Sequence, residues 1–534
     1  MNRTVKALVG ALAALAVLAI GVVLWMQTLA RDAGPQGRPT YGPYAWSGPG
    51  NKGQAPTPRG GPVPREDGYV MGSQGFDAIL PPMPPQRVTD VVRAENAARW
   101  VAIKTCFWPG PKLRTGFYTT DPDDYGLENQ IPDIGNTFST AWFRIPAGAR
   151  IVMTGQFPHL RHWSFVTYTE NGTPRDDITD LNMLPDSGSV NPFLPGVRRD
   201  APNRRYTVTI ENGAPPAQRP ANTVYTLAEP GTPIGMHMRN YIPDQGTDWT
   251  GGVGLPEVEL HLADGTVLRG EEACAATDAP RRGKQVPIVV SKKLWLALNS
   301  LPWRPADRTP AKDFDVTTMV RFYNREHLIL DTFFPAIPNN WLAVEKGGFW
   351  SNPVTRYGYT YLSQAYGQVY VARAKMPSTP STFANQGEPL NTQADMRYWS
   401  LCTSTSPAIG NVVDCVHDEN VRPHLDRAGF FNVVVSRAPD RPANATEQCG
   451  VVWMEYGNGD GIPGGSQDFG VLINRHTLVN PGFAQTWFNV KEVGSEAKVM
   501  GPYLPTVINL RTRQKFEALG CPVDTSKLAT MAGH

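Results

Sequence analysis

Two short stretches of the chain share residue types that could bind an anion or a sugar. Residues 161–165 are Arg-His-Trp-Ser-Phe, and residues 397–401 are Arg-Tyr-Trp-Ser-Leu. Alternate residues of a strand share a face, so Arg161 would lie beside Trp163, and Arg397 beside Trp399. An arginine next to a tryptophan in a cleft can hold a carboxylate, a phosphate or a sugar ring. The repetition favours a structural role, in which each arginine pairs with a carboxylate, because related modules need the same supports.

A loop that occurs only in the first half offers further polar groups. Residues 186–193 are Asp-Ser-Gly-Ser-Val-Asn-Pro-Phe. If this loop meets His159 and Arg161, it would form a polar pocket with acid and base groups. The competing interpretation is a turn held by its own side-chain-to-backbone hydrogen bonds. No catalytic residue is assigned, and the candidate ligand-binding residues are His159, Arg161, Asp186, Asn191, Arg397 and Trp399.

Motifs for metals and for known hydrolases are incomplete. Residues 458–461 are Asn-Gly-Asp-Gly and are followed by Asp468, which suggests a calcium loop but lacks the closing glutamate. A hairpin loop is the favoured interpretation. His159 and His162 would face opposite sides of a strand and would chelate poorly. Gly-x-Ser-x-Gly and His-Glu-x-x-His are missing. We therefore predict no metal site and no cofactor, with calcium left open, and the sequence leans against an enzyme.

The N-terminus predicts a membrane anchor. Arg3 and Lys6 precede an uncharged apolar run at residues 7–26. About 20 helical residues span roughly 30 Å, the thickness of a bilayer's hydrocarbon core, whereas a cleavable signal usually has a shorter core. We expect residues 1–33 to form an uncleaved single-pass anchor with the body outside the cytoplasm. The alternative is a cleaved signal. Residues 34–85 are rich in proline and glycine and predict an extended spacer.

The six cysteines of an exported chain favour disulfides over thiols or metal sites. Cys402 and Cys415 flank a turn signal at residues 406–411, and a hairpin about that turn would place them opposite each other. Keeping the other pairs within each half of the chain suggests Cys106 with Cys274 and Cys449 with Cys521.

The body of the chain predicts mainly short strands. Alternating residues at 205–210, 257–262 and 430–435 are typical of strands, and helices are expected at 88–105, 291–301 and 316–327. The repeated Arg-aromatic-Trp-Ser pattern indicates an internal duplication, as do two related closing signatures at 238–241 and 454–456. We expect two tandem, related β-sandwich or jelly-roll modules after the anchor. Their predicted layout is a leading helix at 86–105, module one at 106–275, a Trp/Pro-rich connecting segment at 276–349, module two at 350–521 and a tail at 522–534.

Several further blocks carry a family resemblance. They include Arg-Ile-Pro-Ala-Gly at 144–148, Arg-Pro-Ala-Asn-Ala-Thr at 441–446 and Val-Met-Gly-Pro-Tyr-Leu-Pro at 499–505. Together with the two arginine stretches they resemble a family of uncharacterised, exported, membrane-anchored proteins of high-GC bacteria. Each module is distantly similar to a bacterial β-sandwich domain of unknown function with a recurring Arg-aromatic-x-Ser strand. The resemblance covers most of residues 130–510 and implies no activity.

The functional prediction is a binding or scaffold protein of the bacterial cell envelope, facing the periplasm or the exterior. Its partners would be the membrane, through the N-terminal helix, and a glycan, lipid or protein ligand. An exported hydrolase or carbohydrate-active enzyme with its site in module one is the first alternative. An accessory subunit of a larger membrane complex is the second. The net charge of +2, without a long basic run, argues against nucleic acid.

Overall fold

The computed structural model describes residues 65–66, 69–70, 106–109, 131, 133, 135–169, 172–247, 250–277, 292–301, 311–334, 340–345, 350–384, 387–407, 410, 412–457, 459–460, 466 and 468–533. Within these ranges no helix combines the length and the apolar character that a membrane crossing requires. The expected anchor at 7–26 and the expected helix at 88–105 lie outside the described residues. Of the expected spacer, only the strands β1 (Arg65–Glu66) and β2 (Tyr69–Val70) are described, and they pair with each other.

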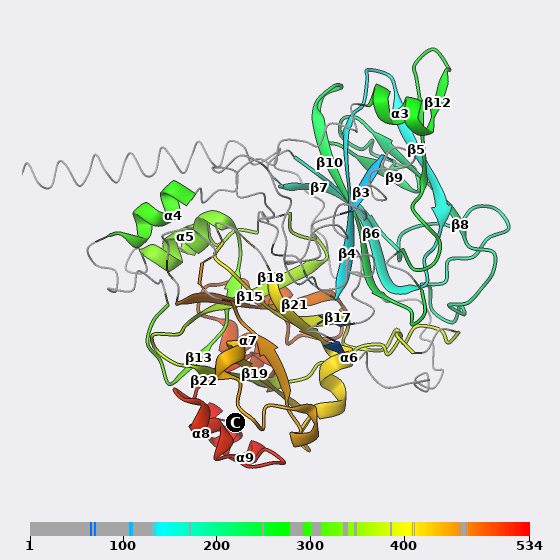
Figure 1. Ribbon diagram of the computed structural model, residues 1–534. Helices are drawn as coiled ribbons and strands as arrows, with labels where there is room; N and C mark the ends of the chain where they lie inside the picture. Colours follow the sequence, from blue (N-terminus) through cyan, green and yellow to red (C-terminus); the bar gives the residue numbers. More distant parts are fainter. Residues whose placement is uncertain are drawn as a thin grey trace, which may run out of the picture.

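The fold is mainly β, with four five-stranded sheets and few helices (Figure 1). We call strands β3 to β12 the first half and strands β13 to β22 the second half. One sheet of the first half has the order β3 (Phe107–Pro109), β4 (Asn136–Arg144), β10 (Pro233–Pro243), β6 (Leu160–Tyr168) and β7 (Pro174–Thr179). The other has the order β12 (Val267–Arg269), β11 (Glu257–His261), β5 (Arg150–Gln156), β8 (Arg205–Glu211) and β9 (Thr223–Tyr225).

The second half repeats this arrangement. One sheet has the order β14 (Val320–Phe322), β15 (Thr355–Ser363), β21 (Phe469–Val479), β17 (Met396–Ser404) and β18 (Val412–His417). The other has the order β13 (Val316–Thr318), β22 (Thr506–Asn509), β16 (Val369–Lys375), β19 (Phe430–Ser436) and β20 (Val452–Glu455). Strands β4 to β11 therefore correspond in order and position to β15 to β22. Even the parallel pair of β8 with β9 recurs as β19 with β20.

This correspondence corrects one sequence expectation. Residues 238–241 lie on β10, which pairs with both β4 and β6 at the centre of its sheet. Residues 454–456 lie on and just after β20, an edge strand that pairs with β19. The two closing signatures are therefore not equivalent. The strand that corresponds to β10 is β21, where Arg475 occupies the position of Arg239, because Arg239 pairs with Ser164 and Arg475 with Ser400.

Each half has a hydrophobic core between its two sheets. In β8 the burial alternates, with Tyr206, Val208 and Ile210 turned inward, as expected for a strand with one face on a core. Trp163 of β6 and Trp399 of β17 are 1% exposed and belong to the cores of the first and second half. A buried tryptophan removes about 150–250 Å² from water, worth roughly 4–6 kcal/mol. The repeated tryptophan is therefore a core residue in both halves.

All nine residues of β6, and all nine of β17, are buried. One face of each strand lies on its own core, and side chains from the two sheets meet across the other face. The rings of Tyr241 on β10 and Tyr398 on β17 are 5.1 Å apart, and Tyr241 lies 4.9 Å from His162 on β6. The sheet that contains β6 thus packs against the sheet that contains β17.

The helices lie around the sheets. They are α3 (Gly270–Ala276), α4 (Lys292–Asn299), α5 (Arg325–Phe333), α6 (Asp418–Val421), α7 (Glu496–Met500), α8 (Arg513–Glu517) and α9 (Thr525–Ala532). The expected helix at 291–301 corresponds to α4. The expected helix at 316–327 is wrong over most of its length, because residues 316–318 pair with β22 and residues 320–322 pair with β15. Helix α5 begins only after Asn324, whose side chain accepts a hydrogen bond from the backbone N–H of His327.

Three disulfides close the fold. They join Cys106 to Cys274, Cys402 to Cys415 and Cys449 to Cys521, which are the pairs that the sequence suggested. Cys402 and Cys415 face each other in the ladder between β17 and β18. The Cys449–Cys521 bond fastens the C-terminal segment, where α8 and α9 pack Phe516 and Leu528 against the second half.

Candidate ligand-binding site

Arg161 and Arg397 support the contact between the two halves. Arg161 of β6 donates to Asp418 and Glu419 at the start of α6, and its Nε donates to Thr382 Oγ1 over 2.9 Å. Arg397 of β17 donates to the carbonyl oxygen of Arg161 over 3.0 Å. Its Nη1 lies 3.6 Å from Asp180 Oδ2, just beyond β7. Each arginine thus approaches a carboxylate of the opposite half.

The two carboxylates also hold equivalent places in their own halves. Asp180 accepts a hydrogen bond from the backbone N–H of Trp163 over 2.8 Å, and Asp418 accepts one from the N–H of Trp399 over 3.2 Å. All four charged side chains are inaccessible to solvent. These positions fit a structural role better than the recognition of a ligand.

The four candidate residues of the first half do not form one pocket. His159 lies 2.9 Å from Arg204 Nη1, and Arg161 points to the second half. Asp186 accepts hydrogen bonds from Thr207 Oγ1 over 3.2 Å and from within its own turn, while Asn191 donates to the carbonyl oxygens of residues 180 and 183. Burial and the nearby guanidinium groups of Arg204 and Arg199 lower the pKa of His159 to about 4. None of the four has another of the four as a partner.

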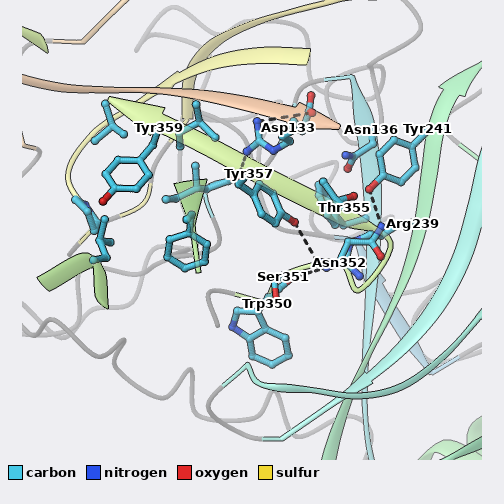
Figure 2. A pocket seen from close by; sticks show the side chains of 18 of the residues that line it. Asp133, Asn136, Arg239, Tyr241, Trp350, Ser351, Asn352, Thr355, Tyr357 and Tyr359 are labelled. Carbon is cyan, nitrogen blue, oxygen red and sulfur yellow. Dashed lines mark hydrogen bonds and ion pairs between the residues drawn. The ribbon is translucent and has the colours of Figure 1, made fainter. Parts of the chain in front are cut away.

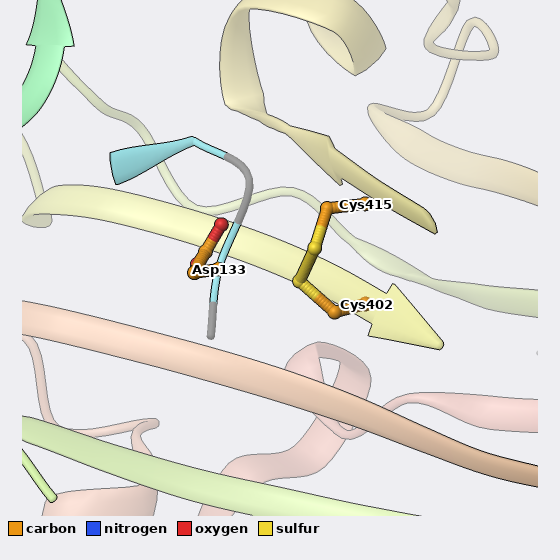
Figure 3. Close-up of side chains that lie close together, drawn as sticks. All are labelled: Asp133, Cys402 and Cys415. Atoms are coloured by element: carbon orange, nitrogen blue, oxygen red, sulfur yellow. A yellow bond between two sulfur atoms is a disulfide. The ribbon is translucent and has the colours of Figure 1, made fainter. Parts of the chain in front are cut away.

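The side chains that could bind a metal ion are also engaged in bonds within the protein. Within the described residues, the group with metal-like spacing is Asp133 with Cys402 and Cys415. The two sulfurs form a disulfide (Figure 3), so neither is a thiolate that could bind a metal. Asp460, from the expected calcium loop, accepts hydrogen bonds from Trp295 Nε1 and from the N–H of Ser466, each over 2.9 Å.

A cavity opens elsewhere, between the two halves. About 760 Å³ of space lies between its walls, the solvent at its open mouth included. Figure 2 shows polar side chains on one side, namely Asn136, Tyr241, Arg239 and Asn352, with Tyr359 on the opposite side. The wall comes from β4 and β10 of the first half, from β14, β15 and β21 of the second half, from α5 and from residues 350–352.

The apolar side of the cavity is built on β15. Tyr357, Tyr359 and Tyr361 alternate along this strand and all line the cavity. They pair in register with Arg475, Ile473 and Val471 of β21. The lining therefore changes from charged to apolar along these two strands, and Phe322 and Leu328 add to the apolar part.

Arg239 is the central polar group of the cavity. It is 3% exposed, and its Nη2 donates to the carbonyl oxygen of Trp350 over 2.5 Å. Its guanidinium lies 5.5 Å from the centre of the Phe138 ring and 5.4 Å from that of Tyr168. Its Nη1 is buried without a hydrogen-bond partner among the described residues. Among the described residues, the charge is therefore held by aromatic faces and one carbonyl, and no described carboxylate contacts it.

Arg475, the counterpart of Arg239, is neutralised. Its Nη2 donates to the carbonyl oxygen of Ile131 over 2.6 Å, and its Nη1 lies 3.7 Å from Asp133 Oδ2. Asp133 also accepts hydrogen bonds from the hydroxyl groups of Tyr398 and Ser400, over 2.8 Å and 2.5 Å. This carboxylate is therefore fully engaged within the protein.

The sequence does not predict this cavity. Its residues come from segments far apart in the chain, and Arg239 stands out in the sequence only as part of a closing signature. The spacing of three tyrosines at 357, 359 and 361 was the available signal, because it predicts one aromatic face of a strand.

No family model and no curated protein matches the chain. Among solved structures, an uncharacterised protein from Burkholderia cenocepacia is 12% identical with a TM-score of 0.37, over 82% of this chain and 94% of that one. A protein from Vibrio parahaemolyticus is 11% identical with a TM-score of 0.31, over 72% and 92% of the two chains. Both are distant structural similarities to uncharacterised bacterial proteins. Membership of the family suggested by the sequence blocks stays a prediction.

Proposed function

We propose that this protein is a non-catalytic binding protein of the bacterial cell envelope, and that the cavity between the halves is its ligand site. In this proposal residues 7–26 anchor the chain and the body lies outside the cytoplasm. The three disulfides support an oxidising compartment. The body consists of two tandem, related β-sandwich modules, which is supported by the matching strand orders and by a core within each half.

The observation that carries this proposal is the lining of the cavity. Most of the lining residues are aromatic or aliphatic, and a few polar groups gather near Arg239, as is typical of small-molecule sites. The described lining contains no histidine, lysine or cysteine, and so no histidine or lysine base that could activate the hydroxyl groups of Ser351 and Thr355. Its carboxylate, Asp133, is held by Tyr398 and Ser400. These groups suit holding a ligand better than reacting with one.

The test is to identify what the protein carries in its own host. The full chain is purified from host membranes, washed and denatured, and the released small molecules are identified by mass spectrometry. Val471→Trp would fill the cavity, since Val471 lines it and is 3% exposed. Val316→Trp is the matched control, because Val316 is exposed on a strand of a sheet that contributes no residue to the described lining.

We expect one compound in near-stoichiometric amount from the wild type and from Val316→Trp, and little of it from Val471→Trp. Equal melting temperatures of the two variants would show that both are folded. A compound retained equally by both variants would place the ligand elsewhere, and no compound from any of the three would refute the proposed function.

A further inference from the structure

Arg239 differs in its charge balance from three other buried arginines of the described chain. Arg199 contacts Asp244, Arg321 contacts Glu345 and Arg373 contacts Asp426. Arg239 is equally buried but faces aromatic rings and the carbonyl oxygen of Trp350. A guanidinium stays charged in proteins, and a buried charge without a counter-charge is costly. This position would therefore be stabilised by an anion that the described residues do not supply.

The total charge of the described lining also indicates an anionic ligand. The described lining contains two guanidinium groups, Arg239 and Arg475, and one carboxylate, Asp133, so the described residues leave one excess positive charge. Asp133 lies 3.7 Å from Arg475 and so compensates that arginine rather than Arg239. A ligand with a single negative group would balance the site.

The remainder of the cavity would hold an apolar group. Tyr359 and Tyr361 lie further along β15 than Tyr357, and Ile473 and Val471 face them on β21. Such a wall contacts hydrocarbon or ring faces and offers few polar partners. The hydroxyl of Tyr361 is engaged by Thr332 Oγ1 over 2.6 Å, and that of Tyr359 lies 3.3 Å from Asp331.

We propose that the cavity binds an amphiphile with one anionic group, a carboxylate or a phosphate, which Arg239 receives while the apolar part lies along Tyr359 and Tyr361. This inference rests on the proposed binding function and adds the chemical class of the ligand. A charge-assisted hydrogen bond to a desolvated guanidinium should favour the anion over an uncharged analogue by about tenfold or more.

The experiment uses the full chain in phosphatidylcholine nanodiscs and three photoreactive probes with the same alkyl chain: dodecanoic acid, dodecyl phosphate and dodecanol. Each carries a diazirine near the end of the chain. Labelling of the peptides that contain β15 and β21 is measured by mass spectrometry against probe concentration. We expect at least one of the anions to half-saturate this labelling at a concentration at least about tenfold below that of dodecanol.

Variants separate recognition from folding. Arg239→Met should abolish the preference for the anion and should lower the melting temperature only slightly, because it removes one hydrogen bond, to the carbonyl oxygen of Trp350, and leaves no described carboxylate unpaired. Arg239→Lys should retain part of the preference. Arg198→Met should leave it unchanged, since Arg198 pairs with Asp200 on the surface.

Two negative results have different meanings. If acid, phosphate and alcohol label the cavity equally, or if Arg239→Met keeps the anion preference, the inference about the ligand is overturned and the proposed binding function stands. If no probe labels β15 or β21, and no compound is recovered from the host protein, the proposed function itself is refuted.

Discussion

Replacing Arg161 by methionine should destabilise the protein far more than the same change at Arg397. Arg161→Met leaves two buried carboxylates, Asp418 and Glu419, without their main partner. Removing one member of a buried ion pair costs about 3–5 kcal/mol. We expect a value near the lower end, about 3 kcal/mol, because Arg422 remains 3.4 Å from Asp418 and 3.5 Å from Glu419.

Arg397→Met should cost about 1–2 kcal/mol, close to the value of a buried hydrogen bond to a charged group. The nearest carboxylate, Asp180, lies 3.6 Å away and keeps its hydrogen bonds from His162 Nδ1 and the N–H of Trp163. The pKa values also indicate that Arg161 interacts more strongly with carboxylates than Arg397 does. Burial lowers the pKa of Arg397 to about 10, whereas the carboxylates of Asp418 and Glu419 outweigh burial and raise that of Arg161.

Urea unfolding at pH 7.5, with disulfides intact and tryptophan fluorescence as the signal, would measure both variants. Adding Asp418→Asn and Glu419→Gln to Arg161→Met removes the unpaired charges and should restore much of the lost stability. The reasoning is refuted if the two arginine variants are equally stable, or if the added changes destabilise the protein further. Arg198→Met, at an exposed ion pair, is the control and should behave as wild type.

Three other perturbations give separate tests. Burial lowers the pKa of five described histidines, among them His476, whose pKa falls to about 3. Since an unfolded histidine has a pKa of about 6.5, the unfolded state binds protons first as the pH falls, and stability is lost below about pH 6.5. His476 should account for about 2.5 kcal/mol of the free energy of unfolding that is lost between pH 7.5 and 4.5. His476→Gln should therefore reduce the pH dependence of the free energy of unfolding, measured with urea, by that amount, and an unchanged dependence would contradict this. Gly358→Ala would place a Cβ 2.1 Å from the buried ring of Trp487. This change should lower the free energy of unfolding by about 1–3 kcal/mol. Adding Trp487→Phe should recover part of that loss in thermal melts, and no recovery would contradict a clash with Trp487. Replacing Cys402 and Cys415 by serine should cost about 3 kcal/mol, the value for a closed loop of this length, and an unchanged urea midpoint would show that the bond does not constrain the unfolded chain.

The sequence predicted those parts of the fold that local patterns determine. The repeated Arg-aromatic-Trp-Ser stretch identified β6 and β17 as equivalent strands, and alternation located β8, β11 and β19. The expected helix at 316–327 was wrong for a tertiary reason. Residues 316–318 pair with residues 506–508, and a partner so far away in sequence leaves no trace in local periodicity.

The candidate site was harder to predict than the strands. An arginine in a sequence gives no sign of whether it will be buried or whether a carboxylate will reach it. The sequence favours a structural role for Arg161 and Arg397 because both halves repeat them, and that role stays a prediction. Arg239 lies in a signature whose match at residues 454–456 is not its structural equivalent, so the sequence does not pair it with its counterpart Arg475.

The comparison of Arg239 with Arg475 shows how the two halves of the fold differ at the proposed ligand site. Arg161 and Arg397 kept equivalent supporting roles, each near a carboxylate of the opposite half. Arg239 and Arg475 hold equivalent places on β10 and β21, yet Asp133 lies beside Arg475 alone. The difference between the halves leaves one positive charge at a cavity that both halves line. If the two halves had kept a carboxylate at both places, the cavity would carry no excess charge. The ligand site that we propose therefore lies where the two halves differ, and the contact between them lies where their arginines and carboxylates correspond.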